Sequence, residues 1–298
     1  MPKSFGASER RICGLFPPGA RFYYGGTEWV VVLSGKPTCH HGEPKTDIYI
    51  AARSPSGQVR EFKLSFKQEN ADFLENKMTA ERAALLFGRN WQRIISNATT
   101  NLYHAFASRP LIYKSGYRKV EAGSITLGWK FELLNVDSGR LSGNMLLSRS
   151  QVIDVYAGTH LPGDKRHATV SGYVIPDSGI ANCILVEDHF FRSPQDVVDS
   201  LISVEEYVAE HPQVYFACKA LNYRTFRGKY DGDRPLAVYV DWWAEGGRLC
   251  SALRFDTPLM QGGDDAFEGL HRAMRQLRVR TTDELNAGNV ADPGTIWE

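Results

Sequence analysis

The segment VREFKLSFK, residues 59–67, constrains the fold more than any other stretch of the chain. Apolar Phe62, Leu64 and Phe66 alternate there with charged and hydroxyl side chains. Successive side chains of a β-strand point to opposite faces, so this pattern predicts a strand with one buried face and one polar face. The polar face carries Lys63 and Lys67, which predicts either a solvated face or a lysine with a chemical role.

Two further strands precede this one, and the three are predicted to form an antiparallel meander. The segments TEWVVVLSG (27–35) and TDIYIAA (46–52) are rich in β-branched and aromatic residues. The turn formers of SPSGQ (54–58) separate the second strand from the third. The sequence therefore predicts that residues 46–52 pair with residues 59–67 through a tight connection.

Helices are predicted after the meander and in the second half of the chain. The expected helices cover residues 68–88, 91–107, 193–212 and 264–277. Short strands are expected between them, with antiparallel pairs outnumbering helical crossovers. The sequence thus predicts a mixed α/β (α+β) fold. A loose boundary is expected to separate residues 1–160 from residues 161–298, unless the two parts form one continuous domain.

The composition limits the environment and the partners. Of the 298 residues, 43% are hydrophobic and 23% are charged, which is ordinary for a globular protein. No apolar run approaches the roughly 18 residues of a membrane span, so no membrane association is expected. The five cysteines are odd in number and far apart, which favours a reduced, cytoplasmic protein without a disulfide framework. Because the net charge is only +1, nucleic acid would have to bind a local basic patch.

Asp47 and Lys67 are the first candidate pair of functional side chains. Asp47 stands near the start of the second strand of the meander, and Lys67 ends the third. If these strands pair through the turn at 54–58, their far ends lie side by side, and a carboxylate meets an ammonium at one edge of the sheet. One carboxylate seldom holds Mg²⁺, which prefers one or two carboxylates together with water and substrate oxygens.

Glu81 is the favoured second acid. It follows Leu74 by seven residues and Met78 by three, and it precedes Leu85 by four. In a helix over residues 68–88, this spacing places the carboxylate within the apolar stripe. A buried carboxylate has to be paired with a base or bound to a metal. A salt bridge to a basic residue at the edge of the core is therefore the alternative to a metal.

The segments GEPKTD (42–47) and LSFK (64–67), followed by a helix with Glu81, resemble in their order the PD-(D/E)xK nuclease superfamily. They are most similar to type II restriction endonucleases in which Ser replaces the usual Glu and the missing acid comes from the next helix, fourteen residues after the lysine. The resemblance implies a restriction-endonuclease-like core, in which helices flank a central mixed sheet, with additional antiparallel strands. It also implies that Asp47 and Glu81 bind Mg²⁺, that Lys67 assists the attacking water and that Ser65 marks the vacated acidic position.

The function that the resemblance implies is sequence-specific, Mg²⁺-dependent cleavage of double-stranded DNA, with 5′-phosphate ends as products. Symmetric DNA sites favour a homodimer, since the symmetry of a protein and that of its site match. Two alternatives stay open. One is a non-specific, repair or defence nuclease with the same core, and the other is a non-catalytic DNA-binding or scaffold protein.

Glu61 and Lys63 form a competing pair. The tripeptide EFK by itself fits the acid-x-lysine signature of many metal-dependent nucleases. Glu61 is close to the turn, however, at the opposite end of the hairpin from Asp47. Several residues of strand, at roughly 3.3 Å each, should separate the two acids. A solvated strand end also explains Glu61 and Lys63.

Basic and aromatic residues interleave in the segment KALNYRTFRGKYDGDR (219–234), the main candidate for a DNA-binding surface. Arginine suits both phosphates and guanine edges. The residues expected to contact DNA are Arg224, Arg227 and Lys229 in this segment, together with Lys45 and Gln68, which flank the proposed centre. An ordinary solvated hairpin is the alternative for residues 219–234.

Overall fold

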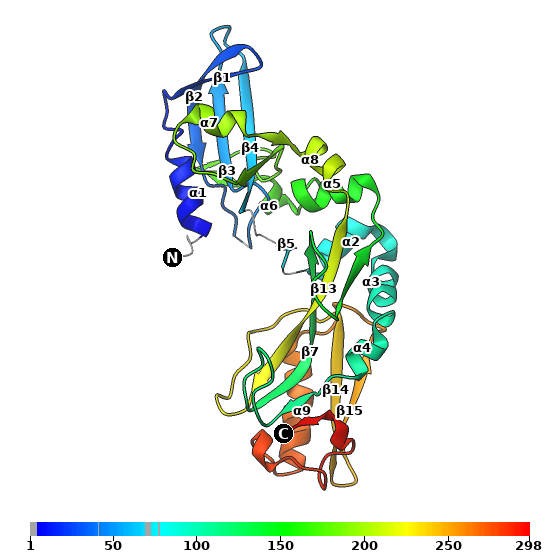
Figure 1. The fold of residues 1–298 in the computed structure, drawn as a ribbon. Coiled ribbons are helices and arrows are strands. Elements are labelled where there is room, and N and C mark those ends of the chain that lie inside the picture. Colours follow the sequence, from blue (N-terminus) through cyan, green and yellow to red (C-terminus); the bar gives the residue numbers. More distant parts are fainter. Residues whose placement is uncertain (1–4, 41, 69–72, 77) are drawn as a thin grey trace. The chain divides into compact units, whose positions relative to one another are not determined.

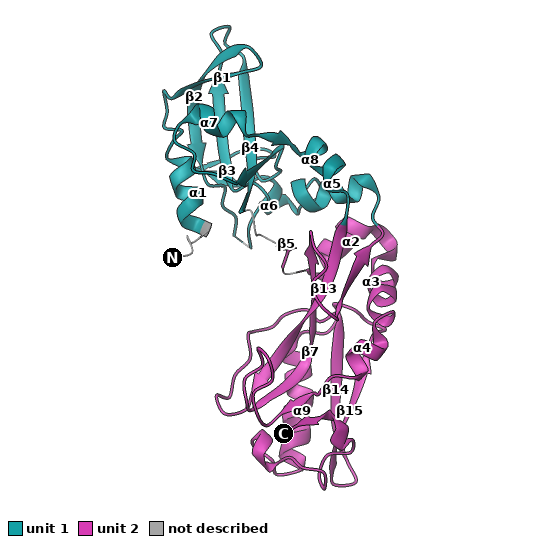
Figure 2. Cartoon of the chain, in the orientation of Figure 1, with its two compact units in different colours: residues 1–72, 147–213 teal, residues 73–146, 214–298 magenta. Residues whose placement is uncertain are grey.

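The structure is a computed structural model that describes residues 5–40, 42–68, 73–76 and 78–298 (Figure 1). The chain divides into two compact units, which Figure 2 shows in different colours. Unit 1 comprises residues 1–72 and 147–213, and unit 2 comprises residues 73–146 and 214–298. The chain thus passes back and forth between the units, and this division differs from the sequence-based boundary at residue 160.

Unit 1 contains a mixed sheet whose described strands run in the order β1-β2-β3-β4-β11-β12. These strands are β1 (Arg21–Tyr24), β2 (Thr27–Gly35), β3 (Ile48–Arg53), β4 (Val59–Gln68), β11 (Cys183–Glu187) and β12 (Ile202–Ser203). A separate two-stranded ribbon consists of β9 (Thr169–Val170) and β10 (Tyr173–Val174). The helices are α1 (Phe5–Cys13), α5 (Arg149–Ala157), α6 (Gly163–Arg166), α7 (Pro194–Asp199) and α8 (Val204–Glu210).

The predicted meander is confirmed. Strand β2 pairs antiparallel with β3, and β3 pairs antiparallel with β4, with Ile48 opposite Leu64. Strand β11 then joins β4 as a parallel neighbour, with Val186 opposite Lys67. A parallel neighbour requires a long crossover connection. The chain between β4 and β11 supplies it and contains the first part of unit 2.

The main hydrophobic cluster of unit 1 lies on one face of this sheet, and a smaller cluster of Tyr49, Ala51 and Val170 lies on the other. Ile48 of β3 and Phe66 of β4 are buried in the main cluster, as the alternating pattern predicts. Ile12 of α1 and Val197 of α7 belong to the same hydrophobic cluster. Both helices therefore cover the face of the main cluster, and α1 is held against the sheet by its own apolar side chains.

Unit 2 is built around a second sheet, whose main strands run in the order β15-β14-β7-β13-β8. Its strands are β5 (Phe73–Glu75), β6 (Ile112–Tyr113), β7 (Ser124–Leu134), β8 (Ser142–Met145), β13 (Val214–Arg224), β14 (Val238–Glu245), β15 (Arg248–Arg254) and β16 (Ile296–Trp297). Its helices are α2 (Ala80–Phe87), α3 (Trp91–Thr100), α4 (Tyr103–Ala107) and α9 (Gly263–Gln276). Phe106 of α4 packs edge-on against Trp129 of β7, with ring centroids 5.0 Å apart. The mixed α/β class predicted from the sequence is confirmed.

The expected helix over residues 68–88 is wrong for its first part. The helix begins at Ala80, because the Thr79 side chain caps it by accepting a hydrogen bond from the Arg82 N–H at 3.1 Å. Residues 73–75 form β5 instead. Residues 69–72 and 77 lie outside the described residues.

The other expected helices are confirmed with changed boundaries. Residues 91–107 form α3 and α4, and residues 264–277 contain most of α9. The segment 193–212 forms two helices, because Ser203 and Glu206 make a capping box that starts α8 anew. Within the described ranges, no helix has the length and the apolar character that crossing a membrane would need.

Candidate active site beneath the first helix

Several strand ends of unit 1 meet at one edge of its sheet. Strands β2, β4 and β11 run in one direction and β3 in the other. The residues at this edge are therefore Lys36 after β2, Asp47 before β3, Lys67 near the end of β4 and Glu187 at the end of β11. The predicted meeting of Asp47 and Lys67 at one edge of the sheet is confirmed by this register.

Helix α1 is tied to the same edge by polar contacts on two sides. Glu9 accepts a hydrogen bond from the Lys36 ammonium, with Oε2 and Nζ 2.7 Å apart. The Arg11 guanidinium and the Ser8 hydroxyl donate to Oε1 of Glu187 at 2.9 and 3.1 Å. These contacts fix the direction in which Glu9 points, and they bring a second carboxylate close to Asp47.

Asp47 is positioned by the backbone of the neighbouring strand. Its N–H donates to the Leu64 carbonyl at 2.8 Å, and its Oδ2 accepts a hydrogen bond from the Phe66 N–H at 2.7 Å. These two bonds hold the carboxylate at the end of the β3–β4 pair. Functional side chains need such support, because a loosely held carboxylate cannot keep a ligand in a defined geometry.

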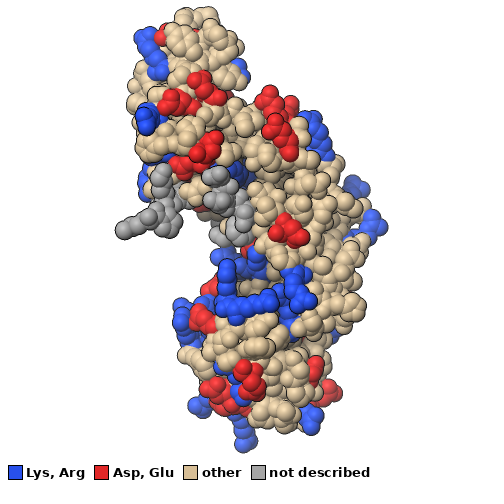
Figure 3. Space-filling model, in the orientation of Figure 1, with Lys and Arg blue, Asp and Glu red and all other residues tan. Residues whose placement is uncertain are grey.

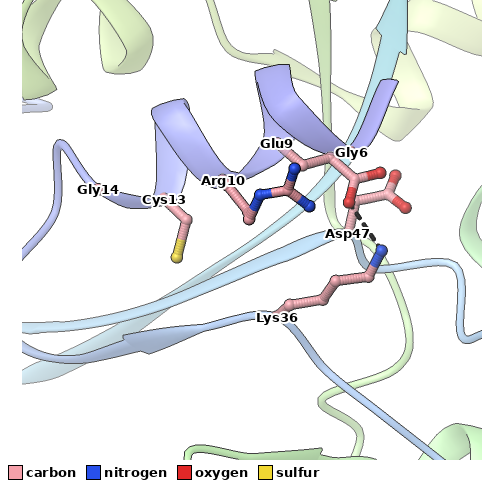
Figure 4. Close-up of a pocket in the computed structure, with 7 residues that line it drawn as sticks. All are labelled: Gly6, Glu9, Arg10, Cys13, Gly14, Lys36 and Asp47. Atoms are coloured by element: carbon pink, nitrogen blue, oxygen red, sulfur yellow. Dashed lines mark hydrogen bonds and ion pairs between the residues drawn. The ribbon is translucent and has the colours of Figure 1, made fainter. Parts of the chain in front are cut away.

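A cavity of about 550 Å³ opens beneath α1. The residues that line it are Gly6, Glu9, Arg10, Cys13, Gly14, Lys36 and Asp47. Figure 4 shows the carboxylates of Glu9 and Asp47 side by side, with the Lys36 ammonium close to both. The cavity therefore brings together two acids from distant parts of the sequence.

The surroundings of Asp47 oppose its ionisation. Desolvation raises the pKa of Asp47 to about 6, although the positive charge of Lys67 and the Phe66 hydrogen bond act in the opposite direction. The negative charge of Glu9 raises it further. An aspartate with a pKa near 6 in a cavity is typical of a functional site. Burial likewise raises the pKa of the Cys13 thiol, which keeps that group neutral.

Ser65 follows Leu64, which lies opposite Ile48 in the pairing of β3 with β4, and it stands where the resemblance expects the vacated acid. Its side chain is buried, and its Oγ has no hydrogen-bond partner within the described part of the chain. An isolated buried hydroxyl is unfavourable. The position therefore tolerates a small polar group, but the structure gives that group no contact with the cavity.

The prediction that Glu81 occupies a buried apolar stripe is wrong. Glu81 lies in the first turn of α2 and is exposed. Because the helix starts at Ala80, Leu74 and Met78 precede it, and the stripe that they were expected to form does not exist. Glu81 belongs to unit 2 and Asp47 to unit 1. The helix dipole stabilises an acid in the first turn of a helix, which suffices to explain a glutamate at this position.

Glu61 and Lys63, the competing pair, are engaged in structural contacts. Glu61 lies opposite Ala51 in the pairing of β3 with β4, four residues along β3 from Asp47. The Tyr49 hydroxyl donates a short hydrogen bond to Glu61, and Lys63 Nζ donates to the Asp177 carbonyl at 3.0 Å. These two side chains therefore lie apart from the cavity and connect β4 to its neighbours.

The residues expected to contact DNA differ in availability. Arg224 pairs with Asp231 and, at 3.7 Å, with Glu121, and these pairs compete with any phosphate. Arg227 also pairs with Glu121, at 3.0 Å, but its side chain is more than half exposed. Lys229 is exposed and follows the turn after β13, where it forms an isolated β-bridge with Arg224.

Lys45 lies two residues before Asp47 in the chain, and Gln68 directly follows Lys67. The Lys45 N–H donates to the Gly179 carbonyl at 3.0 Å, and Gln68 lies opposite Glu187 at the end of β4. Sequence reasoning missed Glu9, Arg10 and Lys36. The one available signal was an acid near the N-terminus, and no spacing connects it with Asp47.

Comparisons of the chain with protein-family models, with curated proteins and with solved structures find no match. The geometry of the cavity is therefore the basis on which a function is assigned.

Proposed function

We propose that the cavity beneath α1 hydrolyses phosphodiester bonds of double-stranded DNA with a bound Mg²⁺, and that the protein is a site-specific endonuclease. The observation that carries this proposal is the meeting of Glu9 and Asp47 in one cavity. The charge of Lys67, on the adjacent strand, acts on Asp47. Glu9 takes the place that the sequence assigned to Glu81. The order of an acid just before β3 and a serine and a lysine on β4 supports the same chemistry.

The donor set fits Mg²⁺. Glu9 and Asp47 offer carboxylate oxygens, and Mg²⁺ is usually held by one or two carboxylates, with water and substrate phosphate completing its shell. The raised pKa of Asp47 means that the protein alone stabilises the ionised carboxylate poorly. A cation between the two acids would supply the missing stabilisation. The neutral Cys13 thiol offers no competing thiolate.

The chain's own residues have distinct roles in this proposal. Asp47 and Glu9 hold the cation, which when bound lowers the pKa of a coordinated water and offsets phosphate charge. Lys67 places a positive charge where negative charge develops on the phosphate. Arg10 is exposed at the wall of the cavity, and its planar guanidinium suits a phosphate oxygen pair.

Unit 2 carries an excess of basic side chains, which suits binding of a DNA duplex. It carries 21 Lys and Arg against 17 Asp and Glu, whereas unit 1 carries 14 against 17. Figure 3 shows basic side chains gathering on the face of unit 2 over β13 and β7. Lys130 of β7 and Lys219 of β13 lie opposite each other in that sheet. A homodimer with two cavities would cut both strands of a symmetric site.

The test is cleavage of supercoiled plasmid DNA by the full chain in Mg²⁺ and in EDTA. We expect cutting in Mg²⁺ alone, with Asp47→Asn and Lys67→Met each slowing it by about 10²-fold or more. Asp241→Asn is the matched control, because it removes a carboxylate from a surface pair with Arg254 on unit 2. That variant should cut like the wild type.

Two results would overturn the proposal. One is intact DNA in Mg²⁺ across a range of plasmid sequences, which favours a non-catalytic DNA-binding protein. The other is full activity of Asp47→Asn. Discrete fragments support site-specific cutting, whereas a smear supports the non-specific nuclease that the sequence also allows.

A further inference from the structure

We infer that Lys36 is the resident counter-ion of the two-carboxylate cavity, and that a divalent cation must displace its ammonium from Glu9 in order to bind. This inference rests on the proposed metal-dependent function and adds a regulatory residue to it. No part of the sequence pattern that predicts Asp47 and Lys67 includes Lys36.

The contact between Lys36 and Glu9 is short, and the Glu9 side chain is far more buried than that of Lys36. Nζ of Lys36 lies 2.7 Å from Oε2 of Glu9, a distance typical of a charge-assisted hydrogen bond. The Glu9 side chain is only 5% exposed, whereas that of Lys36 is 46% exposed. A buried carboxylate needs a cationic partner. Lys36 meets that need in the absence of a metal.

The charge around Lys36 comes from more than one acid. Although desolvation opposes it, the hydrogen bond and the charge of Glu9 raise the pKa of Lys36, with further contributions from Glu43 and Asp47. The ammonium is therefore held in the field of both cavity carboxylates. Figure 4 shows its Nζ close to the space between them. A divalent cation bound to Glu9 and Asp47 would compete for this same space.

Lys36 can leave this space more easily than Glu9 can. It directly follows β2, at the start of the loop that leads to Asp47, and its four-carbon stem is flexible. Glu9 sits on α1, whose Ile12 is fully buried in the core. Metal entry would therefore move the lysine, while the acid stays in place.

Displacement would also change the surface that meets DNA. The released ammonium would join Arg10 at the cavity wall, where a phosphate group could contact both. A bound metal ion and a bound DNA phosphate would then each favour the state in which Lys36 is released. Each would therefore strengthen the binding of the other, because such coupling is reciprocal. Lys36 would thus link metal binding to DNA binding.

The test measures binding of Mg²⁺ or Ca²⁺ alone by calorimetry, without DNA, for the wild type and Lys36→Met. We expect Lys36→Met to bind either metal about five- to tenfold more tightly, because the competing charge is gone. Its melting temperature without metal should fall, since Glu9 is left unpaired, and its metal-induced rise should exceed that of the wild type. Lys114→Met is the matched control, because it breaks another Lys–Glu pair, with Glu298 on unit 2. It should bind metal like the wild type.

Lys36→Arg tests the same idea in the opposite direction and keeps the charge. A guanidinium can hold Glu9 with two parallel bonds, so this variant should bind metal several-fold more weakly than the wild type. Metal binding to the wild type that Lys36→Met does not tighten would overturn the role of Lys36 and leave the proposed function intact. If Lys36→Met does not fold, Lys36→Arg provides the test. Metal binding by Lys36→Arg that is as tight as that of the wild type, or tighter, would overturn the role of Lys36 and leave the proposed function intact. The absence of metal binding in all variants would overturn both.

Discussion

At the scale of single residues, Asp47 is a candidate functional residue that also lowers the stability of the folded protein. Its surroundings raise its pKa to about 6, so its ionised form is unfavourable in the folded protein at neutral pH. Asparagine has the same shape and can still accept the Phe66 hydrogen bond. We therefore expect Asp47→Asn to raise the free energy of unfolding at pH 8 by about 1–2 kcal/mol, as measured by urea denaturation without metal.

The pH dependence of this gain has a defined sign. The folded-state pKa of Asp47 lies above its unfolded value of 3.8, so the wild type gains stability as the pH falls through 6 towards 4. The advantage of Asp47→Asn should be fully present above pH 6 and should shrink to nothing below about pH 4. An advantage that grows as the pH falls would contradict the assigned pKa.

Ser65 gives a second prediction at this scale. Its buried Oγ makes no hydrogen bond within the described residues, so the hydroxyl costs stability. We expect Ser65→Ala to be more stable than the wild type by about 1 kcal/mol in the same assay, and to cut DNA at the wild-type rate. Loss of cutting with normal folding would mean that the hydroxyl takes part in the reaction.

The sequence predicts some of these residues and not others for a physical reason. Asp47 and Lys67 lie on strands joined by a short turn, so local pairing rules bring them together. Glu9 reaches Asp47 only because α1 packs across the sheet and is fastened to Lys36 and Glu187. Such tertiary contacts leave no periodic signal in the sequence.

At the scale of elements, the position of Glu9 depends on how firmly α1 packs. Ile12 is fully buried between α1 and the sheet. We expect Ile12→Ala to lower the free energy of unfolding by about 3 kcal/mol and to weaken metal binding, because Glu9 loses its fixed direction. Leu146→Ala, at a position that is 94% exposed, is the control and should change neither quantity. A loss below about 1 kcal/mol would show that α1 is held chiefly by its polar contacts.

The differences between the predicted and observed helix boundaries also have a cause at the scale of elements. Apolar periodicity predicts that one helix includes Leu74 and Met78. The structure shows that it begins later, after the N-cap at Thr79. Likewise the capping box at Ser203 divides the segment 193–212. Both caps are visible as short sequence signals, and they outweigh apolar periodicity in setting where a helix begins.

At the scale of the whole molecule, the two units are interleaved in the chain. Residues 73–146 belong to unit 2 and lie in the chain between β4 and β11, which are both strands of unit 1. Residues 214–298 complete unit 2. The sequence shows no composition change at residues 72 or 146. Hence the fold class could be predicted, but the division into units could not, because it depends on which strands pair over long distances.

We propose that Glu9, and not Glu81, is the second acid of the cavity that contains Asp47. The most direct measurement compares Mg²⁺-dependent plasmid cutting by Glu9→Gln and Glu81→Gln, with folding of each checked by thermal melting. We expect Glu9→Gln to lose cutting by about 10²-fold or more and Glu81→Gln to cut like the wild type. Full activity of Glu9→Gln together with an inactive, folded Glu81→Gln would contradict the account.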